Sequence, residues 1–232
     1  MRIFVDPAAL IAGVLVVRGD EHHYLARVRR ARPGDAVELV DGAGRRAAAT
    51  ISRIADAETT LEAGPPEQIA ARPPFVRALV PLIKGDRMDV CLEKLVEVGV
   101  DAIVVWPAAR SVIRLDDSRR DARLAKYQAL AQAAARQSGR AQVPSVEIVA
   151  SLAAALPGLP DGLRLVFDPT SDVGLEVGAA TDVTLASGPE GGLAPEELDR
   201  LAGFTPLGLG PRVLRAETAP MVAVALIRAV TR

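Results

Sequence analysis

The chain has 232 residues, half of them hydrophobic but only 3% aromatic, and its 28 Lys and Arg against 29 Asp and Glu give a formal net charge of −1. This length suits one large domain or two modest ones, and a core of this composition must be built mostly from Ala, Val and Leu. Since no apolar run is long enough to cross a bilayer and no signal-peptide pattern stands at the N-terminus, we expect a cytoplasmic protein without a membrane segment.

The first 70 residues have the pattern of a small β-rich domain. Pro33-Gly34-Asp35 and Asp41-Gly42-Ala43-Gly44 predict turns, because Gly and Pro interrupt regular structure. Short apolar runs rich in β-branched residues lie between and beside these turns, and they predict strands. The expected strands are residues 14–17, 36–40 and 47–54.

A linker and a change of pattern follow. Prolines in the segments 64–66 and 72–74 indicate the linker, since Pro disfavours helix interiors and central strands. Beyond it, strand patterns alternate with helix patterns, which is typical of an α/β domain with a mainly parallel sheet. We therefore expect a β-rich domain over residues 1–72 and an α/β domain over residues 73–232.

The α/β region is predicted to contain six strands and four helices. The strands are residues 75–83, 103–106, 146–149, 163–167, 183–186 and 206–209. The helices are residues 86–98, 118–138, a helix that begins at Pro195, and residues 219–228. The single cysteine, Cys91, is expected as a buried thiol on the first helix, and alone it forms no intrachain disulfide or Cys-rich metal site. The last helix is apolar nearly all round, which indicates burial in a core or a subunit interface.

Positive charge is concentrated in one segment. Residues 110–140 carry eight Arg and Lys against three Asp, whereas the remainder of the C-terminal half is acidic. A basic block in a near-neutral protein can bind phosphate groups. A solvated helix surface has the same composition, so charge alone leaves both interpretations open.

Two glycine-rich segments each follow an apolar, strand-like run. The first is Ser187-Gly188-Pro189-Glu190-Gly191-Gly192, and the second extends from Leu207 through Gly208 and Gly210 to Pro220. Glycine lets the backbone turn sharply and lets a ligand approach the main chain closely. Two such loops at strand ends predict one ligand pocket.

The sequence motifs that commonly form such a pocket match these segments poorly. The segment from Gly208 to Val213 begins like a dinucleotide-binding motif but lacks its third glycine, and residues 188–192 lack the Gly-Lys-Ser/Thr ending of a phosphate loop. His22 and His23 are adjacent without a third ligand nearby, so no metal site is expected. No Gly-x-Ser-x-Gly motif of a hydrolase is present.

In their order along the chain, the motifs resemble those of the RsmE family of ribosomal RNA methyltransferases. The matching segments are residues 22–30 with 33–35, 84–88, 93–100, 110–111, 135–140, 143–144, 188–192 and 207–220. The last two are quite specific, and the whole ordered set is highly specific. Phe167-Asp168-Pro169 matches its counterpart only loosely, and the first domain is rich in Ala and Arg.

The resemblance implies a two-domain fold and an activity. The first domain would be a PUA-like β-barrel that binds RNA. The second would be a SPOUT-type α/β methyltransferase domain with a trefoil knot, one of the rare exceptions to unknotted topology. Such enzymes are homodimers that transfer a methyl group from S-adenosylmethionine to N3 of a uridine in the 16S rRNA of the small ribosomal subunit, by convention position 1498.

The resemblance also assigns cofactor-binding residues. They are Phe167, Ser187, Gly188, Pro189, Glu190, Gly191, Gly192, Leu207, Gly208, Leu209, Gly210, Val213, Leu214, Arg215, Thr218 and Ala219. Leu209 and Leu214 would hold the adenine by apolar contact. The same glycines also suit an ordinary strand-to-helix turn, and the same leucines suit core packing.

Three residues of the loops are candidates for catalysis. Methyl transfer requires alignment of N3 with the methyl group and removal of the N3 proton, so positioning and a general base are the main needs. Glu190 and Glu217 are the available carboxylates, and Arg215 would lie near the methyl donor or the uracil. Arg215 and Glu217 could equally form a structural ion pair, and Thr218 could be a helix N-cap.

Basic side chains outside the loops are the candidate RNA contacts. Arg136, Gln137 and Arg140 close the basic segment at a helix end, where guanidinium groups suit phosphates or a uracil edge. Arg110, Lys84, Arg87, Arg27 and Arg30 are further candidates. Surface solvation is the alternative for each.

Two other functions compete with the enzyme. A noncatalytic RNA-binding module would use the barrel and the basic helix and would bind RNA without S-adenosylmethionine. A nicotinamide enzyme would need the missing third glycine of the dinucleotide motif.

Overall fold

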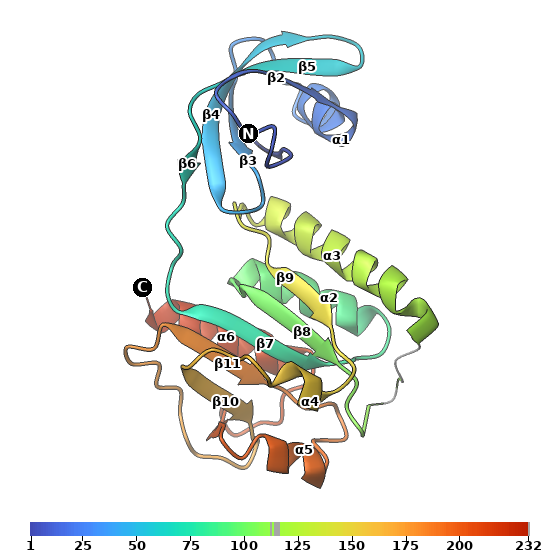
Figure 1. Ribbon diagram of the computed structural model, residues 1–232, viewed down its shortest axis with the longest axis vertical. Coiled ribbons are helices and arrows are strands. Elements are labelled where there is room, and N and C mark those ends of the chain that lie inside the picture. The colour runs from blue at the N-terminus through green and yellow to red at the C-terminus, as the bar shows by residue number, and fades with distance from the viewer. Residues whose placement is uncertain (112, 114–116, 232) are drawn as a thin grey trace. The chain divides into compact units, whose positions relative to one another are not determined.

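A computed structural model describes residues 1–111, 113 and 117–231 of the chain. By its internal contacts the chain divides into two compact units. The first contains residues 1–71 and 135–143, and the second contains residues 72–134 and 144–232. Figure 1 shows both units, with elements labelled where there is room.

The first unit is built on one six-stranded sheet of order β1-β3-β4-β5-β2, with β6 paired to β4. Its strands are β1 (Arg2–Phe4), β2 (Gly13–Arg18), β3 (Ala36–Val40), β4 (Arg45–Ile54), β5 (Glu58–Ala63) and β6 (Glu67–Gln68). Strands β2, β3 and β4 confirm the three predicted strands. The pairings are antiparallel except that of β1 with β3. Alternate side chains of β4 and β5 are buried, among them Ile51 and Leu61, because successive residues of a strand face opposite sides.

Several elements of this unit lie outside the sequence prediction. A short helix α1 (Gly19–His23) continues into a π-helix (Tyr24–Val28), and β5 follows β4. Strand β5 was missed because Thr59 occupies a fully buried position where the pattern calls for an apolar residue. Its hydroxyl lies 2.9 Å from Nδ1 of His22, which is also buried, and Nε2 of His22 lies 3.2 Å from the Asp56 carbonyl oxygen. Both ring nitrogens of His22 are therefore engaged within the core.

The second unit is built on a six-stranded sheet of order β12-β10-β11-β7-β8-β9. Every neighbouring pair is parallel. The strands are β7 (Phe75–Pro81), β8 (Ala102–Trp106), β9 (Ser145–Ile148), β10 (Leu163–Phe167), β11 (Asp182–Ala186) and β12 (Thr205–Leu207). All six predicted strands are present, and the mainly parallel α/β sheet is confirmed. Since the strands are parallel, their carboxyl ends meet along one edge, where parallel sheets bind ligands.

The helices cover the two faces of this sheet. They are α2 (Asp86–Val98), α3 (Arg120–Gln137), which follows a 3-10 turn (Asp117–Arg119), α4 (Leu152–Ala155), α5 (Pro195–Arg200) and α6 (Thr218–Val230). On one face, Leu152 of α4 and Leu201 after α5 pack with Trp106 and Leu79 of the strands. Helices α2 and α6 pack against each other. Helix α4 was not predicted, being a single turn.

Helix α6 is buried on one face and accessible on the other in the single chain. Its side chains Ala223, Val224 and Ile227 are buried, but Leu226 is 42% exposed and Val230 is 62% exposed. One face of the helix therefore packs on the unit and the other carries accessible apolar groups. No described helix is both long enough and apolar enough to cross a membrane.

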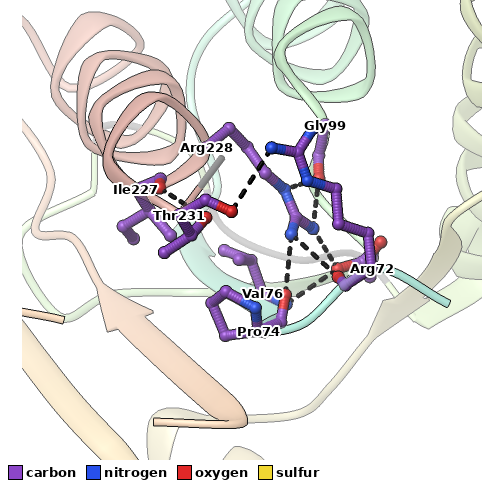
Figure 2. Close-up of polar contacts among 8 residues, drawn as sticks. Arg72, Pro74, Val76, Gly99, Ile227, Arg228 and Thr231 are labelled. Atoms are coloured by element: carbon purple, nitrogen blue, oxygen red, sulfur yellow. Dashed lines mark hydrogen bonds and ion pairs between the residues drawn. The ribbon is translucent and has the colours of Figure 1, made fainter. Parts of the chain in front are cut away.

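Arg228, near the end of α6, ties the helix to the amino ends of two strands (Figure 2). Its guanidinium donates to the carbonyl of Pro74 at 2.7 Å before β7, to the carbonyl of Gly99 at 2.7 and 2.9 Å before β8, and to the Asp101 carboxylate. The carboxylate of Asp101 also accepts from the backbone N–H of Val76 at 2.8 Å. Because both charged side chains are mostly buried, this cluster is a structural feature of the fold and not a surface ion pair.

The first prediction concerns this cluster. Arg228→Met keeps an unbranched side chain but leaves three backbone carbonyls and a largely buried carboxylate without the guanidinium, so the free energy of unfolding is expected to fall by about 3 kcal/mol. Urea denaturation followed by circular dichroism measures the change. Arg200→Met, at an exposed position of α5, is the matched control and is expected to stay within about 0.5 kcal/mol of the parent protein. Equal stability of the two variants would contradict a stabilising role for Arg228.

Candidate active site

A cavity of about 760 Å³ lies at the carboxyl ends of β10, β11 and β12. In the sheet, β10 stands between the other two strands, with Val166 opposite Ala186 of β11 and Phe167 opposite Leu207 of β12. The two glycine loops begin directly after Ala186 and Leu207, so strand register sets them on either side of β10. The sheet thus brings together the two segments that the sequence analysis assigned to one pocket.

Most residues expected to bind a cofactor line this cavity. They are Phe167, Ser187, Gly188, Pro189, Glu190, Gly192, Leu207, Leu209, Gly210, Val213, Leu214, Arg215 and Ala219. Gly191, Gly208 and Thr218 lie beside it without forming its lining. Thr218 is the first residue of α6, and Glu217 occupies the N-cap position without a side-chain cap bond.

The cavity also has a wall that the sequence analysis missed. This wall comes from the end of β10, from α5 and the turn after it, and from the second loop. Its residues are Val166, Asp168, Pro169, Leu193, Leu198, Leu201, Ala202, Phe204, Pro206, Arg212 and Ala216. Leu198, Leu201 and Ala202 have the i, i+3, i+4 spacing of one helix face, which was the available signal.

The second loop is held against the segment that follows β10. The N–H of Gly208 donates to the carbonyl oxygen of Val173 at 2.9 Å, and the N–H of Asp168 donates to that of Leu207 at 3.1 Å. A Cβ atom added at Gly208 would stand 2.0 Å from the carbonyl oxygen of Ser171, far inside van der Waals contact. Only glycine allows the two backbones to approach this closely.

Among the candidate catalytic carboxylates, Glu190 reaches the cavity. Its Oε1 lies 2.8 Å from Nη1 of Arg87 in α2, and both side chains are partly exposed. Arg87 was predicted as an RNA contact, and the structure places it beside the first glycine loop. Lys84 is exposed in the segment between β7 and α2.

Glu217, by contrast, is 8% exposed and is absent from the cavity lining. Its Oε2 is buried without a hydrogen-bond partner among the described residues. Burial, together with the negative charge of Glu217, raises the pKa of the Cys91 thiol to about 12. Arg215 is exposed at the cavity, and within the described part of the chain no ion pair joins it to Glu217.

Arg136 is held inside the first unit. Its Nη1 lies 2.6 Å from Oε1 of Glu21, and its guanidinium stacks over the ring of Phe4 at 5.4 Å. Burial raises the pKa of Glu21 although Arg136 opposes that shift, so the carboxyl lies in a largely desolvated position. Gln137, next in the chain, is exposed, and Arg140 is half-buried.

The remaining RNA candidates lie on two separate units. Arg27 and Arg30 are exposed on and after the π-helix of the first unit. Arg110 is exposed in the second unit, in the loop after β8, where its Nη1 donates to the carbonyl of Gly191 at 3.3 Å. This contact places Arg110 directly beside the first glycine loop.

Comparison with known protein families defines the class of protein. Residues 72–228 match the family model of an RNA methyltransferase domain, and residues 17–59 match the model of an RNA methyltransferase PUA domain. A parallel α/β unit with a glycine-walled cavity, joined to a small β unit, is thus the domain pair of RNA methyltransferases.

Individual relatives narrow this class. The ribosomal RNA small subunit methyltransferase E of Mycobacterium bovis is 34% identical over 241 residues, which cover 100% of this chain and 92% of that protein. Its namesake in Bacillus subtilis is 31% identical over 91% of this chain and 88% of its own length. The crystal structure of the Neisseria gonorrhoeae enzyme bound to S-adenosyl methionine has a TM-score of 0.84 at 28% identity, covering 99% of this chain and 97% of that one. The chain belongs to the RsmE family of RNA methyltransferases.

The second prediction tests the close approach at Gly208. Gly208→Ala forces its methyl group into the Ser171 carbonyl and is expected to lower the free energy of unfolding by about 3 kcal/mol. Gly174→Ala is the matched control, since nothing lies within 4 Å of a Cβ built there, and about 0.5 kcal/mol or less is expected. Thermal unfolding of the two variants gives the comparison, and a Gly208→Ala protein as stable as the control would refute the geometry.

The third prediction concerns the thiol of Cys91. A buried thiol with a pKa near 12 has almost no thiolate at pH 8, and thiolate is the reactive form. The native protein is therefore expected to leave Ellman's reagent unreacted at pH 8, while one equivalent of thiol reacts in guanidinium chloride. Rapid stoichiometric reaction of the folded protein would show that Cys91 is accessible.

Proposed function

We propose that this protein transfers a methyl group from S-adenosylmethionine to N3 of a uridine in the 16S rRNA of the small ribosomal subunit, by convention position 1498. The observation that carries the proposal is the single cavity formed by the two glycine loops on either side of β10. The name of the curated relatives supports the ribosomal substrate, and the S-adenosyl methionine in the Neisseria gonorrhoeae structure supports the cofactor.

The residues of the cavity suit this cofactor. A volume of about 760 Å³ falls within the range of pockets that enclose ligands of drug size. Phe167, Leu209 and Leu214 supply apolar surface for an adenine ring. Gly210 has a φ of 97°, and nothing lies within 4 Å of a Cβ built there, so its backbone is open to a ligand at close range.

Two side chains are assigned roles in the chemistry. When bound, the cofactor supplies an electrophilic sulfonium methyl group. As the N3–carbon bond forms and the sulfur–carbon bond breaks, the N3 proton must leave, and the carboxylate of Glu190 accepts it at the cavity wall. Arg87, 2.8 Å from Glu190, fixes the orientation of that carboxylate. Glu217 is buried and outside the cavity lining, so Glu190 is preferred as the proton acceptor.

Other residues are assigned to RNA binding. Arg212 and Arg215 stand exposed at the cavity, and Arg110 lies beside the first loop, so these guanidinium groups bind phosphates around the target uridine. Arg27, Arg30 and Gln137 of the first unit, with Arg140 and Lys84, extend the RNA contacts. Arg136 shapes the first unit through Glu21 and Phe4 and acts on RNA indirectly. The target base leaves its stack to enter the cavity.

The finer architecture is part of the same proposal. The first unit is a PUA-like barrel, and the passage of Leu207 and Gly208 against residues 171–173 is the crossing of a trefoil knot. A second copy of the chain covers the exposed Leu226 and Val230 of α6 in a homodimer.

The proposal is tested with purified protein, labelled S-adenosylmethionine, and small subunits or rRNA from a strain that lacks this modification. Incorporation of label, mapped by nuclease digestion and mass spectrometry to one N3-methyluridine, supports it. Transfer to a ribose hydroxyl would assign a different reaction, and RNA binding without any binding of S-adenosylmethionine would favour a noncatalytic module.

The fourth prediction separates chemistry from cofactor binding. Glu190→Gln keeps the shape of the side chain but removes the proton acceptor, so kcat is expected to fall about 100-fold. The Kd for S-adenosylmethionine, measured by calorimetry, is expected to stay within about threefold, because a lost proton acceptor affects the transition state more than the bound cofactor. Glu176→Gln, an exposed carboxylate beyond β10, is the matched control and is expected to retain full kcat. A Glu190→Gln enzyme with normal kcat would remove Glu190 from the chemistry.

A further inference from the structure

A buried carboxylate outside the cavity joins two loops at the carboxyl edge of the sheet. Glu197 in α5 is 9% exposed. Its Oε1 accepts the backbone N–H of Ala109 at 2.7 Å, and its Oε2 accepts that of Ala194 at 2.8 Å. Ala109 belongs to the loop after β8, whereas Ala194 ends the loop that contains Gly188 to Gly192.

The order of strands in the sheet does not by itself place these two loops side by side. Strand β7 lies between β8 and β11, so the loops that follow β8 and β11 meet only by reaching across the end of β7. One carboxylate oxygen caps its own helix at Ala194, and the other is used for a residue 88 positions away in the sequence. Helix capping explains the bond to Ala194 but not the bond to Ala109.

A second contact joins the same two loops. Nη1 of Arg110 donates to the carbonyl of Gly191 at 3.3 Å. A Cβ built at Gly191 would stand 3.1 Å from Cβ of Arg110 and 3.3 Å from its carbonyl oxygen, so the two backbones are in close contact. Any displacement of the β8 loop is therefore transmitted to Gly191 and to Glu190 beside it.

We infer that Glu197 is a positioning residue that couples cofactor binding to RNA binding. The inference rests on the proposed function, because it takes the loop of Glu190 as a cofactor wall and the exposed Arg110 as a phosphate contact. Occupation of the cavity fixes the first glycine loop, and Glu197 fixes the β8 loop with it. Arg110 is then held in place for RNA, and by reciprocity bound RNA tightens the cofactor site.

Coupling is measured with S-adenosylhomocysteine, which binds as the cofactor does but has no methyl group to transfer. Its Kd is determined by calorimetry with and without a small-subunit rRNA fragment. For the parent protein, RNA is expected to lower this Kd about tenfold, within the usual range of coupling between sites. Glu197→Gln leaves one of the two N–H groups facing an amide NH₂, so this ratio is expected to fall below about twofold.

Glu196→Gln is the matched control. Glu196 is the preceding residue on α5 and is exposed, so its variant is expected to keep the tenfold ratio of the parent protein. Thermal unfolding of both variants shows whether Glu197→Gln still folds. A ratio in Glu197→Gln equal to that of Glu196→Gln would overturn the inference.

Arg110→Ala tests the second contact and keeps the inference open to refutation if Glu197→Gln fails to fold. If Arg110 only binds phosphate, its loss weakens RNA binding equally with and without S-adenosylhomocysteine, and the ratio stays unchanged, which would contradict the inference. A reduced ratio supports it. Failure of the parent protein to bind S-adenosylhomocysteine would instead overturn the proposed function, whereas binding without any effect of RNA would overturn the coupling alone.

Discussion

The parallel alignment of six strands is the constraint on which the second unit depends. It gathers at one edge every loop with an assigned role: those after β7, β8, β10, β11 and β12. Because β11 and β12 flank β10, segments that start some twenty residues apart become opposite walls of one cavity. Side chains then join these loops. Arg87 binds Glu190 across the paired strands β7 and β11, and Glu197 binds Ala109 across β11 and β8, which do not pair.

Helix α6 connects this edge with the opposite one. Ala219, in its first turn, lines the cavity. Arg228, near its far end, binds the segments that precede β7 and β8. A helix fixed at both ends of the strands resists rotation and sliding. The arginine cluster (Figure 2) lies near the far end of α6, and the first turn of the same helix contributes Ala219 to the cavity wall, so the cluster helps to hold that wall in position.

The sequence was most informative where function and local geometry use the same residues. Gly188 and Gly210 follow apolar strands, so the glycine clusters predicted one pocket, and the family resemblance assigned many of the residues that line it. The contacts of Arg136 could not be predicted from local sequence. Its charge suggested an RNA contact, but its partners Glu21 and Phe4 are more than a hundred positions away in the chain. Glu197 was passed over for the same reason: in the sequence it is one of two glutamates in a helical first turn, and only the fold brings Ala109 to it.

The backbone contact at Gly208 has a consequence for the entropy of ligand binding. Since Gly208 is bonded to Val173 and closely packed on Ser171, the base of the second loop is ordered before any ligand arrives. A ligand therefore loses little affinity to the ordering of that wall. Residues 210–213 are exposed. The conformational entropy that the chain loses when a ligand binds is therefore concentrated in this segment. The cavity wall is thus preorganised at the base of the second loop and less constrained along its exposed residues 210–213.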